Sequence, residues 1–238
     1  MDRQMNFAII AAGTGSRLAE EGISVSKPMV ELGGKPLIGR LIDIFSKFNP
    51  LSINIIINSE QADTREYLEN LKPAVTVNTV IKSTPGSMHS FYELLPLLKG
   101  YPCCLTTVDT VFNESVFGDY IREFKKSSVD ALMAVTEYID DEKPLFVKCD
   151  ENMAITGFND LKTDEKYVSG GIYCFGEKAY DVSEKCFLSG VIRMRDFQRK
   201  LISEGLSVKA YPMGKIIDID HISDIKKAED LIKNDAFK

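Results

Sequence analysis

A glycine-rich loop near the N-terminus is the first segment whose residue types could carry chemistry. Residues 11–17 read Ala-Ala-Gly-Thr-Gly-Ser-Arg and follow an apolar run. Gly13 and Gly15 would let the backbone approach a phosphate closely and turn its N–H groups inward, and Arg17 adds a fixed positive charge. No Gly-Lys-Ser/Thr follows as in a Walker loop, and Leu18 replaces the third glycine of a dinucleotide fingerprint. By itself the loop predicts a phosphate site and leaves open an ordinary turn between strand and helix.

Three carboxylates lie at positions where they could hold a metal ion beside that phosphate. Asp109 closes the apolar run 103–108, and Asp218 and Asp220 alternate with isoleucines, so both would project from one face of a strand. Transfer chemistry at a triphosphate needs a divalent cation to neutralise charge, and one or two carboxylates suit Mg²⁺. Position alone also leaves open a role for Asp109 in capping a helix or a turn.

The elements that must position these residues alternate between short apolar runs and helical patterns. Continuous apolar strands separated by helices predict a Rossmann-like open sheet, mixed but mainly parallel, with helices on both faces. Ligands bind such sheets at the carboxyl ends of the strands, where the glycine loop and Asp109 would meet. We expect strands at 5–11, 53–57, 75–80, 103–108 and 131–135, and helices after Pro36 and at 64–71, 88–98 and 116–125.

The pattern loosens after about residue 138, where a small β-rich insertion is expected. The sequence predicts strands at 145–149 and 154–158 around a turn at 150–152, and further strands at 166–175 and 216–219. It also predicts a helix at 191–203 and a last helix capped by Ser223. Because no linker or repeat interrupts the chain, one domain spanning residues 1–238 is the simplest interpretation.

Composition limits the classes of partner. The 238 residues are 44% hydrophobic and 27% charged, as in a globular protein, and the net charge is −6. A general nucleic-acid binder would be basic, so a small anionic substrate fits better. The sequence contains neither an apolar run of membrane-spanning length nor a signal-peptide pattern, so we expect a cytoplasmic protein without a membrane partner. Five cysteines without a CxxC pair predict reduced thiols rather than disulfides or zinc.

A second motif follows the loop and makes the pattern specific. Residues 26–29 read Ser-Lys-Pro-Met, and residues 32–38 read Leu-Gly-Gly-Lys-Pro-Leu-Ile. Together with the loop, they resemble the nucleotidyltransferase family that makes nucleotide sugars and cytidyl phospho-alcohols, which includes MobA-like NTP transferases. The resemblance implies that the loop residues wrap the nucleotide and that Arg17 and Lys27 act in catalysis, with Lys27 on the phosphate under attack. The loop residues concerned are Ala11, Ala12, Gly13, Thr14 and Gly15.

The same resemblance implies the metal site and the base-reading segment. Asp109 and Asp218 match the family's Mg²⁺ ligands, and Asp220 would assist Asp218 or bind through water. Gly86 and Ser87 match the segment that reads the base, although Ser87 could instead be an ordinary helix N-cap.

For the acceptor, the resemblance implies a site in the second half of the chain. Asp160 and Lys162 match an acid and a lysine near the acceptor, and Gly171 lies in a strand that would pass beside it. A solvated loop is the alternative for Asp160 and Lys162. Residues 1–137 would then form roughly the NTP-binding half, and residues 138–238 the acceptor-binding half with the second metal carboxylate.

The implied reaction is Mg²⁺-dependent transfer of a nucleoside monophosphate from an NTP to a phosphorylated acceptor. A sugar 1-phosphate is the first expectation, giving an NDP-sugar and pyrophosphate. The alternatives are a cytidylyltransferase acting on a phospho-alcohol such as phosphocholine, a molybdenum-cofactor guanylyltransferase, and an NTP-sensing pseudoenzyme. The presence of Arg17, Lys27, Asp109 and Asp218 disfavours the pseudoenzyme. The sequence leaves open the base, the acceptor, and the choice between a monomer and a homo-oligomer.

Overall fold

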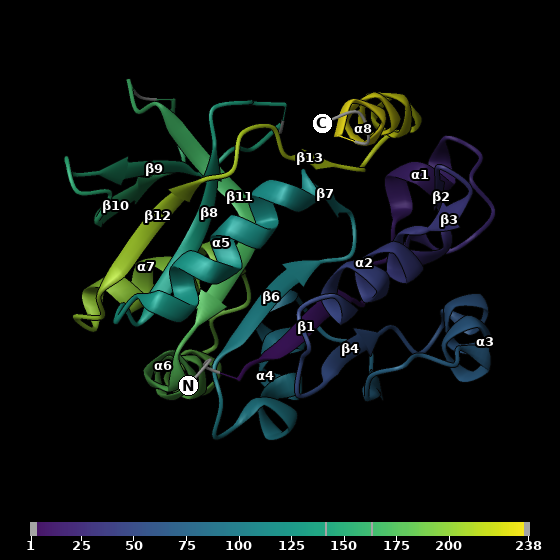
Figure 1. Ribbon diagram of the computed structural model, residues 1–238, viewed down its shortest axis with the longest axis horizontal. Coiled ribbons are helices and arrows are strands. Elements are labelled where there is room, and N and C mark those ends of the chain that lie inside the picture. Colours follow the sequence, from purple (N-terminus) through teal and green to yellow (C-terminus); the bar gives the residue numbers. More distant parts are fainter. Residues whose placement is uncertain (1–3, 141, 163, 236–238) are drawn as a thin grey trace.

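The computed structural model describes residues 4–140, 142–162 and 164–235. A nine-stranded sheet forms its centre (Figure 1). The strands are β1 Asn6–Ala11, β4 Ile53–Ile57, β5 Val77–Ile81, β6 Cys103–Thr107, β8 Ala131–Thr136, β9 Phe146–Cys149, β10 Ile155–Asn159, β11 Tyr167–Phe175 and β12 Val208–Pro212. They follow the order β10-β9-β11-β6-β1-β4-β5, and β8 pairs with β11 and β12.

The strand directions divide the sheet into two parts. β5, β4, β1 and β6 are parallel neighbours, whereas β11 runs antiparallel to β6, β8 and β9. Because the parallel strands end at one edge, the loops after β1 and β6 leave the sheet side by side. The expected fold class, a mixed Rossmann-like sheet with helices on both faces and extra antiparallel strands, is confirmed.

Helices cover both faces of the sheet. They are α1 Ser16–Glu20, α2 Leu37–Ser46, α3 Ala62–Asn70, α4 Ser87–Leu98, α5 Glu114–Lys126, α6 Glu177–Leu188, α7 Met194–Ser203 and α8 Ile222–Asp235, with a 3₁₀ turn, η1, at Lys27–Met29. Residues of α2, α5 and α8 share one buried cluster, and residues of α4, α6 and α7 share the other (Figure 1). No helix in the described ranges is long and apolar enough to cross a membrane.

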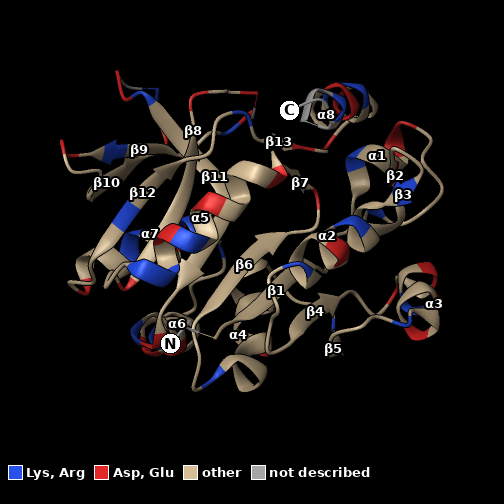
Figure 2. Cartoon of the chain, in the orientation of Figure 1, with Lys and Arg blue, Asp and Glu red and all other residues tan. Residues whose placement is uncertain are grey.

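Alternation along the central strands explains why both faces need cover. In β1, Phe7 and Ile9 enter the first cluster, whereas Ala8 and Ile10 enter the second. Such a strand reads as a continuous apolar run because successive side chains point to opposite faces that are both buried. Figure 2 accordingly shows no charged residue on β1, β4 or β6, and the charges lie on the helices, the loops and outer strands such as β9 and β12.

Several local expectations were wrong. The sequence did not predict α6 or β12, and the helix expected from 191 begins at Met194. Pro36 precedes α2 instead of lying in its first turn, because Lys35–Pro36 (β3) pairs with Glu31–Leu32 (β2). Ser223 does not cap the last helix, which has already begun at Ile222; the Asp224 carboxylate instead accepts the N–H groups that precede it.

Candidate active site

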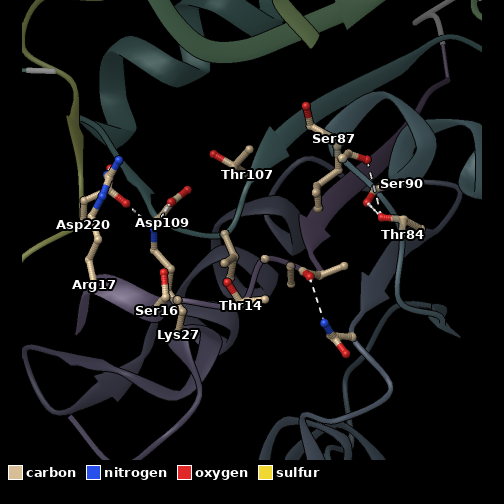
Figure 3. Close-up of a pocket in the computed structure, with 18 of the residues that line it drawn as sticks. Thr14, Ser16, Arg17, Lys27, Thr84, Ser87, Ser90, Thr107, Asp109 and Asp220 are labelled. Atoms are coloured by element: carbon tan, nitrogen blue, oxygen red, sulfur yellow. Dashed lines mark hydrogen bonds and ion pairs between the residues drawn. The ribbon is translucent and has the colours of Figure 1, made fainter. Parts of the chain in front are cut away.

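The glycine loop follows β1 and lines a cavity of about 510 Å³. Lys27, Asp109 and Asp220 lie at one end of this cavity, and Thr84, Ser87 and Ser90 lie at the other (Figure 3). Thr14 and Thr107 lie between the two ends. The cavity therefore offers charged groups at one end and neutral hydroxyls at the other, an arrangement suited to the phosphates and the nucleoside of a nucleotide.

Gly15 occupies a position that only glycine fits without strain. Its φ is +63°, in the left-handed region, where it precedes α1. A Cβ atom on Gly15 would lie 2.9 Å from the Cβ of Lys27. Gly13 has no comparable neighbour within 4 Å. The second glycine of the motif thus brings the loop backbone against Lys27, so the two motifs recognised in the sequence are packed together.

Replacing Gly15 with Ala tests this contact. The new methyl group must displace either the loop or Lys27, so we expect the KM for the nucleotide to rise by about tenfold or more, the order expected when a hydrogen bond to a charged group is lost. Steady-state kinetics would measure this change. Gly22→Ala is the matched control, because Gly22 also has a positive φ, but its methyl group would enter open space and Gly22 does not line the cavity. Equal effects of the two substitutions would contradict the special role of Gly15.

Four charged side chains form a network at the phosphate end. The Lys27 ammonium donates to Asp109 and, at 2.7 Å, to Asp220, and Arg17 donates to the other oxygen of Asp220 at 2.8 Å. Lys27 is nearly buried, with 10% of its side chain exposed, whereas 45% of the Arg17 side chain is exposed. The Lys-Pro step and the strand-end aspartate, 82 residues apart, therefore meet as the sequence predicts.

The surroundings keep Lys27 charged. Burial alone would lower the pKa of Lys27, but the Asp109 and Asp220 carboxylates outweigh that effect and hold this pKa well above its usual range. For Asp218, by contrast, the surroundings favour the uncharged form. Desolvation by the surrounding protein and repulsion from the Asp109 carboxylate raise the pKa of Asp218 to about 7, although this residue lines a cavity and remains exposed. The site thus contains a permanent cation and a carboxylate pair whose repulsion another cation would relieve.

Asp109 and Asp218 fit a divalent metal ion. One oxygen of Asp109, Oδ1, is buried and has no hydrogen-bond partner among the described residues. A buried carboxylate oxygen without a hydrogen-bond partner destabilises the fold unless a bound ligand contacts that oxygen. No group of three His, Cys, Asp or Glu side chains within the described ranges could hold a metal. Two carboxylates are enough for Mg²⁺, which typically takes one or two of them and completes its shell with water and phosphate oxygens.

Asp220 differs from the other two carboxylates. Both of its oxygens already accept hydrogen bonds, from Lys27 and Arg17. The strand β13, Ile217–Asp218, ends before it and pairs with β7, Thr110–Val111, outside the main sheet. Asp220 lines the charged end of the first cavity, whereas Asp218 lines the neighbouring cavities.

The hydroxyl end of the cavity is built on the start of α4. Gly86 precedes this helix, and a Cβ atom on it would lie 2.6 Å from the carbonyl oxygen of Ile192. The Ser87 hydroxyl accepts the N–H of Met194 at 3.0 Å. Ser87 is the first helical residue, so the alternative role as a side-chain N-cap is wrong. Its hydroxyl instead ties the expected base-reading segment to the start of α7.

The predicted acceptor residues lie in cavities beside the first one. Gly171, at φ +72°, and Asp218 line a cavity of about 300 Å³ that also shares Ser87 and Thr107 with the nucleotide cavity. Asp160 and Lys162 line a wider, open cavity of about 720 Å³. The Asp160 carboxylate is engaged by Arg195 at 2.8 Å and Arg199 at 2.6 Å. These contacts hold the Asp160 loop against α7.

No motif in the sequence marks one further cation of the site, Arg193. Arg193 lines both acceptor-side cavities, is exposed, and makes no side-chain ion pair with a described residue. The position of Arg193 depends on hydrogen bonds between the start of α4 and the segment that leads into α7. No local sequence motif predicts these long-range contacts.

His221, the residue next to Asp220, has a structural role. Its Nδ1 lies 2.5 Å from Glu21, and this hydrogen bond raises the pKa of His221. Glu21 also accepts the N–H of Ile222. His221 and Glu21 therefore tie the start of α8 to the end of α1.

A sequence comparison gives the family. The MobA-like NTP transferase domain matches residues 7–163, about two thirds of the chain. The chain belongs to this family. The match includes the glycine loop, Lys27, Asp109 and Asp160, and Asp218 and Asp220 lie beyond it.

The curated relatives that match this chain include a protein named as a cytidylyltransferase. The bifunctional protein GlmU of Gloeothece citriformis is 27% identical over 177 residues, which cover 71% of this chain and 38% of that protein. This chain thus aligns with less than two fifths of that GlmU relative. The choline-phosphate cytidylyltransferase of Streptococcus pneumoniae is 25% identical over 97% of this chain and its own entire length.

A solved structure shares the whole fold. The inositol-1-phosphate CTP transferase from T. maritima superposes with a TM-score of 0.81 at 20% identity and covers 98% of both chains. At this identity the likeness establishes the fold alone.

Proposed function

We propose that this chain transfers a nucleoside monophosphate from an NTP to the phosphate of a small acceptor. Lys27 carries the proposal, because it is a nearly buried ammonium held between Asp109 and Asp220 at the end of a glycine loop. A cation fixed at a nearly buried position, where water screens it less, stabilises charge that develops on a phosphate more strongly than a solvated one would. Membership of the NTP transferase family supports the same reaction.

In the proposed step, an oxygen of the acceptor phosphate attacks the α-phosphorus of the NTP. The bond from that phosphorus to the oxygen bridging it to the β-phosphate breaks, and pyrophosphate leaves with the electron pair. Because the attacking phosphate is already ionised, no protein base is needed. The loop amides and Arg17 hold the β- and γ-phosphates, and Lys27 meets the charge at the α-phosphate.

Mg²⁺, when held by Asp109 and Asp218, would neutralise charge on the phosphates and leaving group. Arg17 is poised to exchange partners, because its contact with Asp220 is largely exposed and exposed ion pairs are weak. A triphosphate can therefore replace Asp220 as the partner of Arg17. We assign donor binding to about residues 1–137, and acceptor binding with the second metal carboxylate to about residues 138–238.

For the donor we propose CTP first. Two proteins that match this chain over almost its whole length are named for CTP or cytidylyl transfer. Gly86 and Ser87, at the hydroxyl end of the cavity, would lie beside the nucleoside.

For the acceptor we propose a sugar 1-phosphate in preference to phosphocholine. The described residues lining the two acceptor-side cavities include only two aromatic side chains, Phe146 and Tyr173, and both are buried. A quaternary ammonium group is recognised by the exposed faces of aromatic rings, which these linings lack. Arg193 and Gly171 instead offer a cation and close backbone approach to a phosphorylated ring.

Pyrophosphate release tests the proposal. We expect release when the chain, Mg²⁺ and CTP are combined with a sugar 1-phosphate, and weaker release with phosphocholine. The panel should include UTP, GTP, ATP and dTTP, with glucose 1-phosphate, inositol 1-phosphate and phosphocholine as acceptors. Nucleotide binding without release under every combination would overturn the proposal and favour an NTP-sensing protein.

A further inference from the structure

One short segment contacts both elements that would hold the triphosphate. We call residues 58–64, which are the loop after β4 and the first residues of α3, the β4–α3 junction. β4 is the parallel neighbour of β1, with Ile57 opposite Ala11. The chain therefore leaves β4 directly beside the point where the glycine loop leaves β1.

The first contact is made by two buried amide side chains. Gln61 donates from Nε2 to the carbonyl oxygen of Gly13 at 3.0 Å, and Asn58 donates to the carbonyl oxygen of Ala12 at 3.4 Å. Each amide is oriented by a further bond: Gln61 Oε1 accepts the N–H of Asn58, and Asn58 Oδ1 accepts the Ser83 hydroxyl. Only 7% of Gln61 and 9% of Asn58 are exposed.

These contacts set the direction of the loop amides. In a trans peptide the C=O and N–H groups point in opposite directions. Holding the carbonyls of Ala12 and Gly13 toward the junction therefore turns the N–H groups of Gly13 and Thr14 away from it. Both residues line the nucleotide cavity, and neither N–H donates a hydrogen bond to any described residue.

The second contact reaches Lys27 through its neighbour. The N–H of Ser26 donates to Asp63 at 2.8 Å, and the Ser26 hydroxyl lies 2.7 Å from that of Thr64. Ser26 directly precedes the η1 turn that begins with Lys27. Asp63 and Thr64 thus fix the start of the turn that carries the ammonium group.

From these contacts we infer that the β4–α3 junction positions the triphosphate-binding apparatus, with Gln61 setting the loop amides and Asp63 setting Lys27. This inference rests on the proposed function. Gln61 and Asp63 are positioning residues, since each acts through another group. Gln61 does not line the nucleotide cavity, so its effect on the nucleotide must pass through Gly13.

Gln61→Glu tests the first contact. The substitution keeps the size of the side chain and its acceptor for Asn58, but places a carboxylate oxygen against the Gly13 carbonyl. We expect the affinity for CTP to fall by about tenfold or more, with the affinity for CMP and the KM for the acceptor nearly unchanged, because the loop amides hold the outer phosphates. Titration calorimetry with CTP and CMP measures the difference. Gln61→Met, which lacks the donor without adding charge, should shift the affinities in the same direction.

Asp63→Ala tests the second contact. We expect kcat to fall by about tenfold while CTP affinity changes little, because Lys27 acts mainly on charge that develops during the reaction. Glu66→Ala is the matched control. It also removes a carboxylate from α3, but Glu66 is exposed and makes no contact with Ser26. Thermal unfolding of every variant separates these effects from loss of fold.

The outcomes distinguish this inference from the proposed function. If the wild-type chain binds no triphosphate, the proposed function fails. If the wild type binds CTP but Gln61→Glu reduces CTP and CMP affinity equally, or leaves both unchanged, the positioning role of Gln61 is overturned. A kcat of Asp63→Ala equal to that of Glu66→Ala would likewise overturn the role of Asp63.

Discussion

Replacing Lys27 with Met should reduce the rate of pyrophosphate release by about a hundred- to a thousandfold, the usual cost of removing one preorganised group that stabilises transition-state charge. Met fills much of the same volume, so the packing against Gly15 is largely retained. The positive charge at the α-phosphate is lost, and Asp109 and Asp220 then face the phosphates without compensation. Both effects raise the barrier, and single-turnover release of pyrophosphate measures it directly.

Lys35→Met is the matched control for this experiment. Lys35 lies in the second motif of the same region, but it pairs with Asp43 on the surface and does not line the nucleotide cavity. We expect the rate of pyrophosphate release by Lys35→Met to remain near that of the wild type. If Lys27→Met kept more than a tenth of the wild-type rate, Lys27 would not be the group that stabilises the developing charge.

The sequence could point to the donor side of the proposed site because the signals there are local. The glycine loop and the Lys-Pro step each occupy a few consecutive residues, and a strand-end aspartate at 109 is placed by the parallel sheet itself. The structure packs Gly15 against Lys27 and pairs Lys27 with Asp109, which joins these separate motifs. The assigned roles of these residues stay predictions until the variants are measured.

The parts that the sequence missed depend on contacts between distant segments. Gln61 matters because β4 lies beside β1, and Arg193 because α7 begins beside α4; neither residue belongs to a recognisable motif. Asp160 shows the opposite problem, because it belongs to a motif but its side-chain partners come from a distant segment. A short motif suggested that it binds the acceptor, but its carboxylate is shared by Arg195 and Arg199, which lie more than 30 residues away. Side-chain partners set by tertiary contacts cannot be read from spacing alone.

The late strand shows how local geometry changed an expectation. Alternation with isoleucine suggested that Asp218 and Asp220 project from one face of a strand. The strand ends at Asp218, however, and Asp220 then bonds to Lys27 and Arg17. The two carboxylates therefore have different partners, and their substitution should give different results.

Asp109→Asn should be the most damaging carboxylate substitution. Asn has nearly the same shape, but it lacks the charge that pairs with Lys27 and that a metal ion would require. We expect pyrophosphate release to fall by about a hundredfold or more, and the Mg²⁺ concentration that gives half-maximal release to rise by about tenfold. Thermal unfolding should show that the fold persists, because Asn keeps the shape of the side chain and Lys27 keeps Asp220 as an ion-pair partner.

Comparison with Asp218→Asn and Asp220→Asn assigns the second metal ligand. Asp218 lies close enough to Asp109 for their charges to repel, so Asp218→Asn should raise the Mg²⁺ requirement as Asp109→Asn does. Asp220 is held by two cations, so Asp220→Asn should mainly change the KM for the nucleotide by freeing Lys27 and Arg17 for the phosphates. If Asp220→Asn instead raised the Mg²⁺ requirement more than Asp218→Asn, Asp220 would replace Asp218 as the metal ligand, and the Lys27–Asp220 contact would have to open when the metal binds.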